Sequence, residues 1–120
     1  MTELHKKYDL EDRTVKFGEL VIDFCKKIKQ DNVSVPIINQ LVRSGTSIGA
    51  NYTEANSASS RKDFKNKIYI CKKEAQETRY WLKMMKRCSR DDEDNMDKLS
   101  QECQELILIF GKILSSLNKN

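Results

Sequence analysis

Residues 60–85 read SRKDFKNKIYICKKEAQETRYWLKMM, and this stretch decides the fold class. Its apolar and small residues recur at alternating steps of four and three, at Phe64, Ile68, Cys71, Ala75, Thr78, Leu82 and Met85. A seven-residue repeat of this kind is typical of a helix that buries one face against neighbouring helices. Ser60 followed by Asp63 has the form of a capping box. The stretch therefore predicts a helix over about 60–90, with its seam residues buried.

The same spacing recurs in three other segments and predicts helices over about 9–30, 34–57 and 92–118. Ser34 is the expected N-cap of the second of these, with Pro36 in its first turn. The predicted helices are joined by short connections, which favour antiparallel neighbours. We therefore predict one all-α domain over residues 1–120, an up-and-down antiparallel four-helix bundle.

Composition is consistent with this fold, and the hydropathy of the chain indicates the cellular compartment of the protein. The 120 residues fit one domain, with 38% hydrophobic and 33% charged residues, one Pro and four Gly. No apolar run approaches the roughly 20 residues of a membrane span, and the first residues lack the apolar core of a signal peptide. We expect a cytoplasmic protein with no membrane partner.

Cysteine and histidine usage gives little support for a metal site or a cofactor. Cys25, Cys71, Cys88 and Cys103 are far apart and form no CxxC pair, and His5 is the single histidine. Cysteines of this kind pack as small apolar residues in a reducing compartment. No cofactor and no metal are expected.

One motif suggests a hydrolase, but its context does not fit. Gly45, Ser47 and Gly49 match the G-x-S-x-G pattern, which needs a strand before the serine and a histidine later in the chain. Here the segment is predicted to be helical, and His5 lies upstream. We therefore expect no catalytic residues, no small-molecule substrate and no enzyme.

The two glycines are more informative about packing. Each costs up to about 1 kcal/mol relative to Ala inside a helix, so some contact should offset that cost. One explanation is close approach of a neighbouring helix within the bundle, and the other is a flat surface for a second subunit. Arg43, Ser47 and Asn51 form a polar row beside the glycines. This row is interpreted as part of an interface, as a solvated face or as a ligand site. The candidate oligomer interface is therefore Arg43, Gly45, Ser47, Gly49 and Asn51.

Charge is unevenly distributed along the chain, whose net charge is +4. Residues 60–90 carry 11 basic and 3 acidic residues, residues 91–120 carry 3 and 7, and residues 1–59 are balanced. Within the 60–90 helix a basic row recurs every seven residues, about 10 Å apart. With two neighbours it gives the candidate nucleic-acid-binding residues Arg61, Lys62, Lys65, Lys72, Arg79 and Lys86.

Two interpretations of this basic row stay open. The row can follow a phosphate backbone, with Tyr69, Tyr80 and Trp81 nearby for base stacking. Alternatively, the row has only a structural role: it pairs with acids of the adjacent helix, for which Glu102 and Glu105 are the candidate partners, or it is simply solvated.

Much of the chain resembles a known family. The run from Leu41 to Tyr52, LVRSGTSIGANY, with Glu54-Ala55, resembles the signature of four-helix bundle proteins encoded in 23S ribosomal RNA intervening sequences. The similarity continues at Lys62-Asp63-Phe64, Ile68, Lys73-Glu74-Ala75, Glu77-Thr78 and Tyr80-Trp81-Leu82. Asp9-Leu10-Glu11 and Arg13, with Phe17, resemble the family's opening.

This resemblance implies a bacterial protein, a left-handed bundle and a ring-shaped homopentamer. It implies no established activity and no catalytic residues. The family is similar in fold to the accessory variability determinant of diversity-generating retroelements, which associates with a reverse transcriptase and nucleic acid. Some members have been labelled ribosomal proteins, but a gene location within a ribosomal RNA gene is no evidence of a ribosomal role.

Three functional hypotheses follow. The first is a non-catalytic homo-oligomer, with a pentamer favoured by the resemblance, that contacts RNA or a nucleoprotein partner through its basic row. The second is a structural or protein-interaction ring whose basic face binds an acidic protein partner, without nucleic acid. A small enzyme is the third and has the least support.

Overall fold

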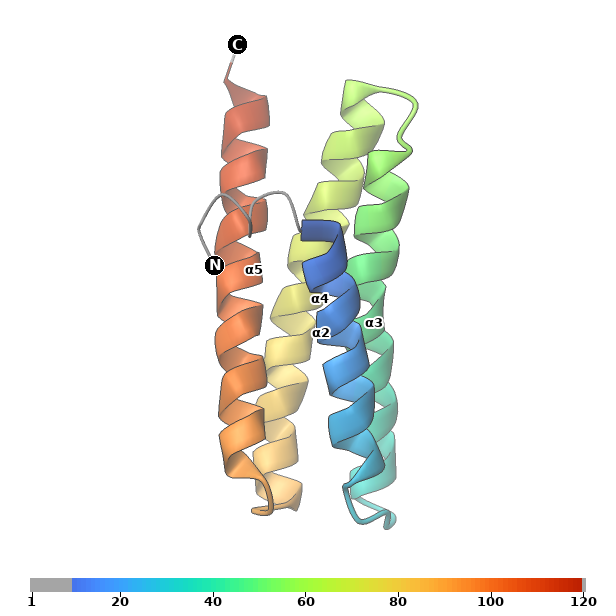
Figure 1. Ribbon diagram of the computed structural model, residues 1–120, viewed down its shortest axis with the longest axis vertical. Helices are drawn as coiled ribbons and strands as arrows, with labels where there is room; N and C mark the ends of the chain where they lie inside the picture. The colour runs from blue at the N-terminus through green and yellow to red at the C-terminus, as the bar shows by residue number, and fades with distance from the viewer. Residues whose placement is uncertain (1–9, 120) are drawn as a thin grey trace.

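The computed structural model describes residues 10–119, most of which lie in four long helices (Figure 1). These are α2 (Leu10–Lys26), α3 (Ser34–Asn56), α4 (Arg61–Cys88) and α5 (Glu93–Asn118). Successive helices run in opposite directions, and each packs on the next, with α2 closing on α5. Residues 10–119 contain no strand. The predicted all-α, up-and-down antiparallel four-helix bundle is confirmed.

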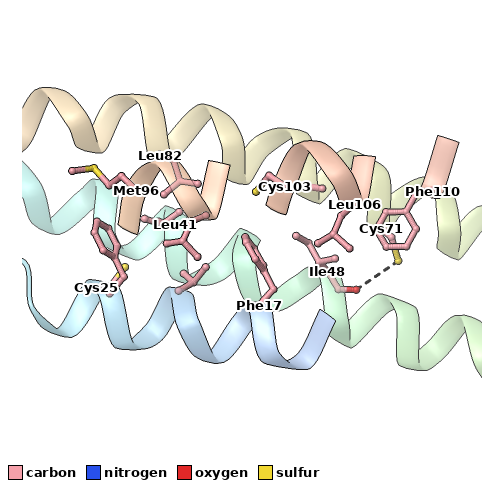
Figure 2. Packing of buried hydrophobic residues seen from close by; sticks show 14 of the residues in the cluster. Phe17, Cys25, Leu41, Ile48, Cys71, Leu82, Met96, Cys103, Leu106 and Phe110 are labelled. Atoms are coloured by element: carbon pink, nitrogen blue, oxygen red, sulfur yellow. Dashed lines mark hydrogen bonds between the residues drawn. The ribbon is translucent and has the colours of Figure 1, made fainter. Parts of the chain in front are cut away.

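Side chains from all four helices meet in one core (Figure 2). Among the described residues, the hydrophobic ones with no exposed surface are Val21, Leu41, Ile48, Ile68, Cys71, Ala75, Leu82, Met85, Met96, Cys103, Leu106 and Phe110. Burial raises the pKa of the Cys25 thiol to about 11 and those of Cys71 and Cys103 to about 12. These thiols stay protonated at neutral pH, so they pack as small apolar groups.

Phe64 is only half-buried, contrary to the expectation that every seam residue is enclosed. Figure 1 shows the reason: α2 begins at Leu10, well below the end of the bundle that holds the α3–α4 connection. Around Phe64 the described part of the chain therefore supplies three helices. Ile113 and Leu114 of α5 also lie half-buried near this end.

The connection from α2 to α3 differs from the sequence prediction. α2 ends at Lys26, four residues before the predicted end, because the N–H groups of Lys27 and Ile28 bond to carbonyls only three residues back. Ile28 continues the apolar spacing and is buried, but it reaches the core from the turn that follows the helix. Apolar spacing alone could not distinguish these two arrangements.

Ser34 does not cap α3: the N-cap position is Val33, which makes no side-chain capping bond, and Asp31 in the preceding turn binds the first N–H groups instead. The Asp31 carboxylate accepts hydrogen bonds from the N–H groups of Val33 and Ser34, at 2.9 and 2.8 Å, and these bonds lower its pKa. Ser34 is instead buried in the connection, where its hydroxyl donates to the Lys29 carbonyl and accepts from the Asp31 N–H. The side chain that binds the first N–H groups therefore lies three residues before the predicted one.

The start of α4 agrees with the sequence. The Ser60 hydroxyl accepts a hydrogen bond from the Asp63 N–H at 3.0 Å, as the capping box predicts. In the reciprocal bond of the capping box, the Asp63 carboxylate accepts from the Ser59 N–H. The usual donor would be the N–H of the next residue, Ser60.

The two glycines of α3 allow α2 to approach closely. A Cβ atom at Gly45 would lie 3.0 Å from both methyl carbons of Val21, and one at Gly49 would lie 3.2 Å from the Thr14 carbonyl oxygen. Both glycines are buried. Close approach of a neighbouring helix within the chain therefore accounts for them, without a second subunit.

This packing predicts opposite effects for two glycine substitutions. Gly49→Ala should lower the free energy of unfolding by about 1–2 kcal/mol, because the steric cost against the Thr14 backbone exceeds the gain in helix propensity. Gly111→Ala should raise it by up to about 1 kcal/mol, since its Cβ would meet only the Lys72 Nζ at 3.9 Å. Urea unfolding followed by circular dichroism measures both, and equal stabilisation by the two substitutions would contradict the packing argument.

Candidate nucleic-acid interface

The basic row lies on the side of α4 that faces α5. Lys65 donates to the Asn118 side chain, Arg79 donates to the Gln104 side chain, and Lys86 forms an ion pair with Asp97 at 2.5 Å. Lys72 lies beside Gly111 and has no hydrogen bond or ion pair within residues 10–119. Three of the four row residues therefore bridge to α5, but only Lys86 is neutralised by a described carboxylate.

The two residues that extend the row at its N-terminal end behave differently from each other. Arg61 donates to the Leu117 carbonyl at 2.6 Å and so binds the C-terminal end of α5, where unpaired carbonyls concentrate negative charge. Lys62 is exposed and makes no polar contact with another described residue. Arg61 is thus partly engaged in holding the bundle, whereas Lys62 is available to a ligand.

The acids expected to neutralise the row are bound to α2 instead. The Arg13 guanidinium forms a bidentate pair with Glu102, at 2.6 and 2.9 Å, and a third bond to Glu105 at 2.5 Å. The Glu102 hydrogen bond is the largest cause of a raised Arg13 pKa. The expectation that Glu102 and Glu105 pair with the basic row is therefore wrong, because Arg13 reaches them from the other side of α5.

The most exposed side of α4 points away from the bundle, and we call it the outer face. It combines basic, amide and aromatic side chains, all exposed: Lys62, Lys65, Tyr69, Lys73, Gln76, Tyr80, Lys83 and Arg87. Tyr69 is 63% exposed and Tyr80 52%. Only Lys62 and Lys65 were among the predicted binding residues. Spacings of four and seven residues from Tyr69 would have found Lys73 and Gln76.

The outer face contains no acidic residue, because the three acids of α4 serve other contacts. Glu74 and Glu77 both bind Arg43 of α3, at 3.3 and 2.7 Å. Asp63 belongs to the cap at the start of the helix. The positive charge of the outer face is therefore not cancelled by carboxylates on the same helix.

The predicted oligomer residues lie in two different environments. Gly45 and Gly49 are buried against α2, as described above. Arg43 binds α4, the Ser47 hydroxyl donates to the Arg43 carbonyl, and the Asn51 amide donates to the Ser47 carbonyl. The polar row thus satisfies itself within the chain, and its part in an assembly stays a prediction.

A surface missed by the sequence interpretation lies between α2 and α3. It is a shallow groove of about 280 Å³ lined by Thr14, Val15, Gly18, Glu19, Ile22, Thr46, Gly49, Ala50 and Thr53. Glu19 is its only charged lining residue, and Val15 and Ile22 are 47% and 40% exposed. The pattern that could have revealed it is the apolar pair at a seven-residue spacing outside the α2 seam.

The described residues also bear on the hydrolase, metal-site and membrane interpretations. Ser47 lies within α3, with its hydroxyl bonded to the helix backbone; His5 lies outside the described residues. Residues 10–119 contain no group of three His, Cys, Asp or Glu that could hold a metal ion. Within the same range, no helix is long and apolar enough to cross a membrane.

A larger groove, of about 460 Å³, separates α2 from α5 beside Arg13. Its floor is apolar, with Phe17, Leu20, Phe24 and Leu99, and charged residues surround it. α2 and α5 contact each other far less than the other neighbouring helix pairs do. The Arg13 cluster therefore joins the two helices where their apolar packing is weakest.

The architecture and the absence of strands in the described chain define a four-helix bundle protein. The family model described as "23S rRNA-intervening sequence protein" matches residues 6–112. This match covers most of the chain, so the protein belongs to the 23S rRNA-intervening sequence protein family. The resemblance found in the sequence is confirmed.

A solved structure agrees with this assignment. The chain is similar to a protein of unknown function from the S23 ribosomal protein family of Bacteroides thetaiotaomicron, known from a crystal structure. The two share 32% sequence identity and a TM-score of 0.77, over 87% of this chain and 96% of that chain. A search of curated proteins gave no match.

The Arg13 cluster makes a prediction about stability. Arg13→Gln should lower the free energy of unfolding by about 1–3 kcal/mol, because Glu102 loses a bidentate partner in a partly buried site. Lys16→Gln, an exposed change on the same helix, serves as the control. A double-mutant cycle with Glu102→Gln, measured by urea unfolding, should show coupling between the two residues. Additive effects would mean that the ion pair contributes nothing to closing the bundle.

Proposed function

We propose that this chain is a non-catalytic RNA-binding protein that acts as a homo-oligomer, with the outer face of α4 as its RNA contact surface. The observation that carries this proposal is the combination on one exposed face of lysines, an arginine and two tyrosines, with no carboxylate. Positive charge attracts phosphates irrespective of sequence, and exposed aromatic rings offer surfaces to bases. The basic row beside it adds Lys72, which has no intrachain partner within residues 10–119.

An acidic protein is the alternative partner for the same face. The exposed tyrosines favour RNA, because an acidic peptide needs only the charges, whereas Tyr69 and Tyr80 add planar surfaces at two points. The contacts of the acids explain why the face is positive, which suits either partner. Glu102 is held by Arg13, and Glu74 and Glu77 by Arg43, so charge pairing within the bundle leaves this one face positive.

Self-association is proposed to use the groove between α2 and α3, with a second copy of the chain as its occupant. Val15 and Ile22 expose apolar surface beside small side chains, and only Glu19 in the lining is charged. Interfaces between copies of one chain are richer in apolar surface and poorer in charge than the remaining surface. The resemblance to the family favours a pentamer.

The first test of this function is the salt dependence of RNA binding. Lys73→Gln and Lys83→Gln should each weaken binding and reduce the slope of log affinity against log salt by about 0.7–0.9, because one fewer counterion is released. Lys86→Gln should have a smaller effect, since Asp97 already pairs with that ammonium group. Fluorescence polarisation of labelled RNA over a salt series measures these slopes.

Lys16→Gln on α2 is the matched control and should leave the slope unchanged, because Lys16 is an exposed lysine on a helix that is not a direct neighbour of α4. All of these variants should unfold at the wild-type urea concentration, since exposed charges contribute little to stability. A wild-type chain that binds no RNA at low salt, but binds an acidic polypeptide, would replace this proposal with the protein-partner alternative.

The second test concerns assembly. Val15→Glu combined with Ile22→Glu should dissociate the oligomer, because carboxylates would be buried between two copies. Sedimentation velocity measures the change, and circular dichroism should show unchanged helix content, since both side chains are exposed in the single chain. Leu108→Glu, a similar change at an exposed position of α5, should leave the mass unchanged. A wild-type chain that sediments as a monomer at micromolar concentration would remove the assembly proposal.

A further inference from the structure

A shallow hollow of about 180 Å³ lies on α4 where the outer face meets Lys72 of the basic row. It is lined by Tyr69, Lys72, Lys73 and Gln76. These residues occur at i, i+3, i+4 and i+7, so successive helical turns place them along one side of α4. The hollow therefore brings an aromatic ring, two ammonium groups and a carboxamide together on an exposed surface.

None of these four side chains is bound to another side chain within residues 10–119, so each is available to a ligand. Tyr69 is the most exposed aromatic residue, and it stacks on no other ring of the described chain. Tyr52, by contrast, is half-buried and packs against Phe110, with ring centres 6.2 Å apart. Lys72, Lys73 and Gln76 form no hydrogen bond or ion pair with other described residues. The Tyr69 ring is therefore accessible to a ligand.

The chemistry of the hollow matches one nucleotide of an unpaired strand. The ring can stack on a base, which requires that the base face be accessible and not covered by a paired helix. The two ammonium groups can contact the adjoining phosphates, and the carboxamide can both donate to and accept from a base edge. A duplex offers phosphates to the lysines but no free base face to Tyr69.

A second aromatic residue lies farther along the same face. Tyr80 is eleven residues after Tyr69, about 16 Å along the helix axis. Consecutive stacked nucleotides rise by about 3.4 Å per strand, so this separation spans about five nucleotide steps. Tyr80 already has an edge contact to Trp81, with ring centres 4.9 Å apart, which holds its ring in place. Lys83 and Arg87 continue the positive charge beyond it.

We infer that the outer face of α4 binds single-stranded RNA, with one unpaired base stacked on Tyr69 and its adjoining phosphates on Lys72 and Lys73. This inference rests on the proposed function and specifies its substrate class. Stacking gives affinity without sequence readout, since every base has an accessible face. The expected specificity is for unpaired over paired RNA.

The test compares one RNA strand in two forms. A fluorescein-labelled strand of about 12 nucleotides, within the range of single-strand site sizes, is used alone and annealed to its complement. Tyr69→Ala should weaken binding of the single strand about 5- to 140-fold, the range for one stacked base, and leave its salt slope unchanged. Tyr69→Phe and Tyr69→Trp should bind as the wild type, and duplex binding should not respond to any of the three.

Lys72→Gln provides the contrast, because it should lower affinity for both RNA forms and reduce the salt slope. Leu108→Ala, a truncation at an exposed position of α5, should change nothing. If Tyr69→Ala binds the single strand like the wild type while Lys72→Gln is still weakened, the stacking inference fails and the proposed function stands. A preference of the wild type for the duplex would also overturn the inference. If the wild type binds neither form at low salt, the proposed function itself fails.

Discussion

The contact of Arg13 with Glu102 and Glu105 links the fold of this chain to its charge distribution. It joins α2 to α5 where apolar packing between neighbouring helices is weakest. The Arg13 side chain is only 15% exposed, so the bidentate contact is less screened by solvent than a surface pair. The same contact commits two α5 carboxylates to α2. If they instead faced α4, they would neutralise Lys72 and Arg79, and the positive surface would be smaller.

A similar arrangement occurs between α3 and α4. Arg43 binds Glu74 and Glu77, and Lys67 binds Glu54 at 2.7 Å. These pairs satisfy the acids of α4 on the side that faces α3. The bundle thus uses these carboxylates in contacts between helices and leaves Lys62, Lys73 and Lys83 of α4 exposed without an acidic partner among the described residues. The clustering of positive charge follows from the packing geometry as much as from the +4 net charge.

The sequence predicted the helices and the buried seams well, because both depend on local periodicity. It failed where two nearby side chains could each accept hydrogen bonds from the N–H groups at the start of α3. Asp31 accepts them, although Ser34 is equally suitable by residue type. It failed again with Phe64, whose burial depends on the starting point of a different helix. The partners of Glu102 could not be predicted either, since the seven-residue pattern places it within reach of both α2 and α4. The heptad row directed attention to the α5 side of α4, whereas the exposed tyrosines lie on the outer face.

The two proposed surfaces are compatible, because they lie on opposite sides of the bundle. α2 and α4 lie diagonally across the bundle, and none of the residues that line the groove belongs to α4, so the groove leaves the outer face of α4 uncovered. An assembly through Val15 and Ile22 would therefore leave one outer face exposed on each subunit. A single site with one or two stacked bases binds weakly, but linked sites gain affinity through their high effective concentration. Assembly would then determine RNA affinity without contributing any contact to the RNA, and loss of either surface would weaken the same function.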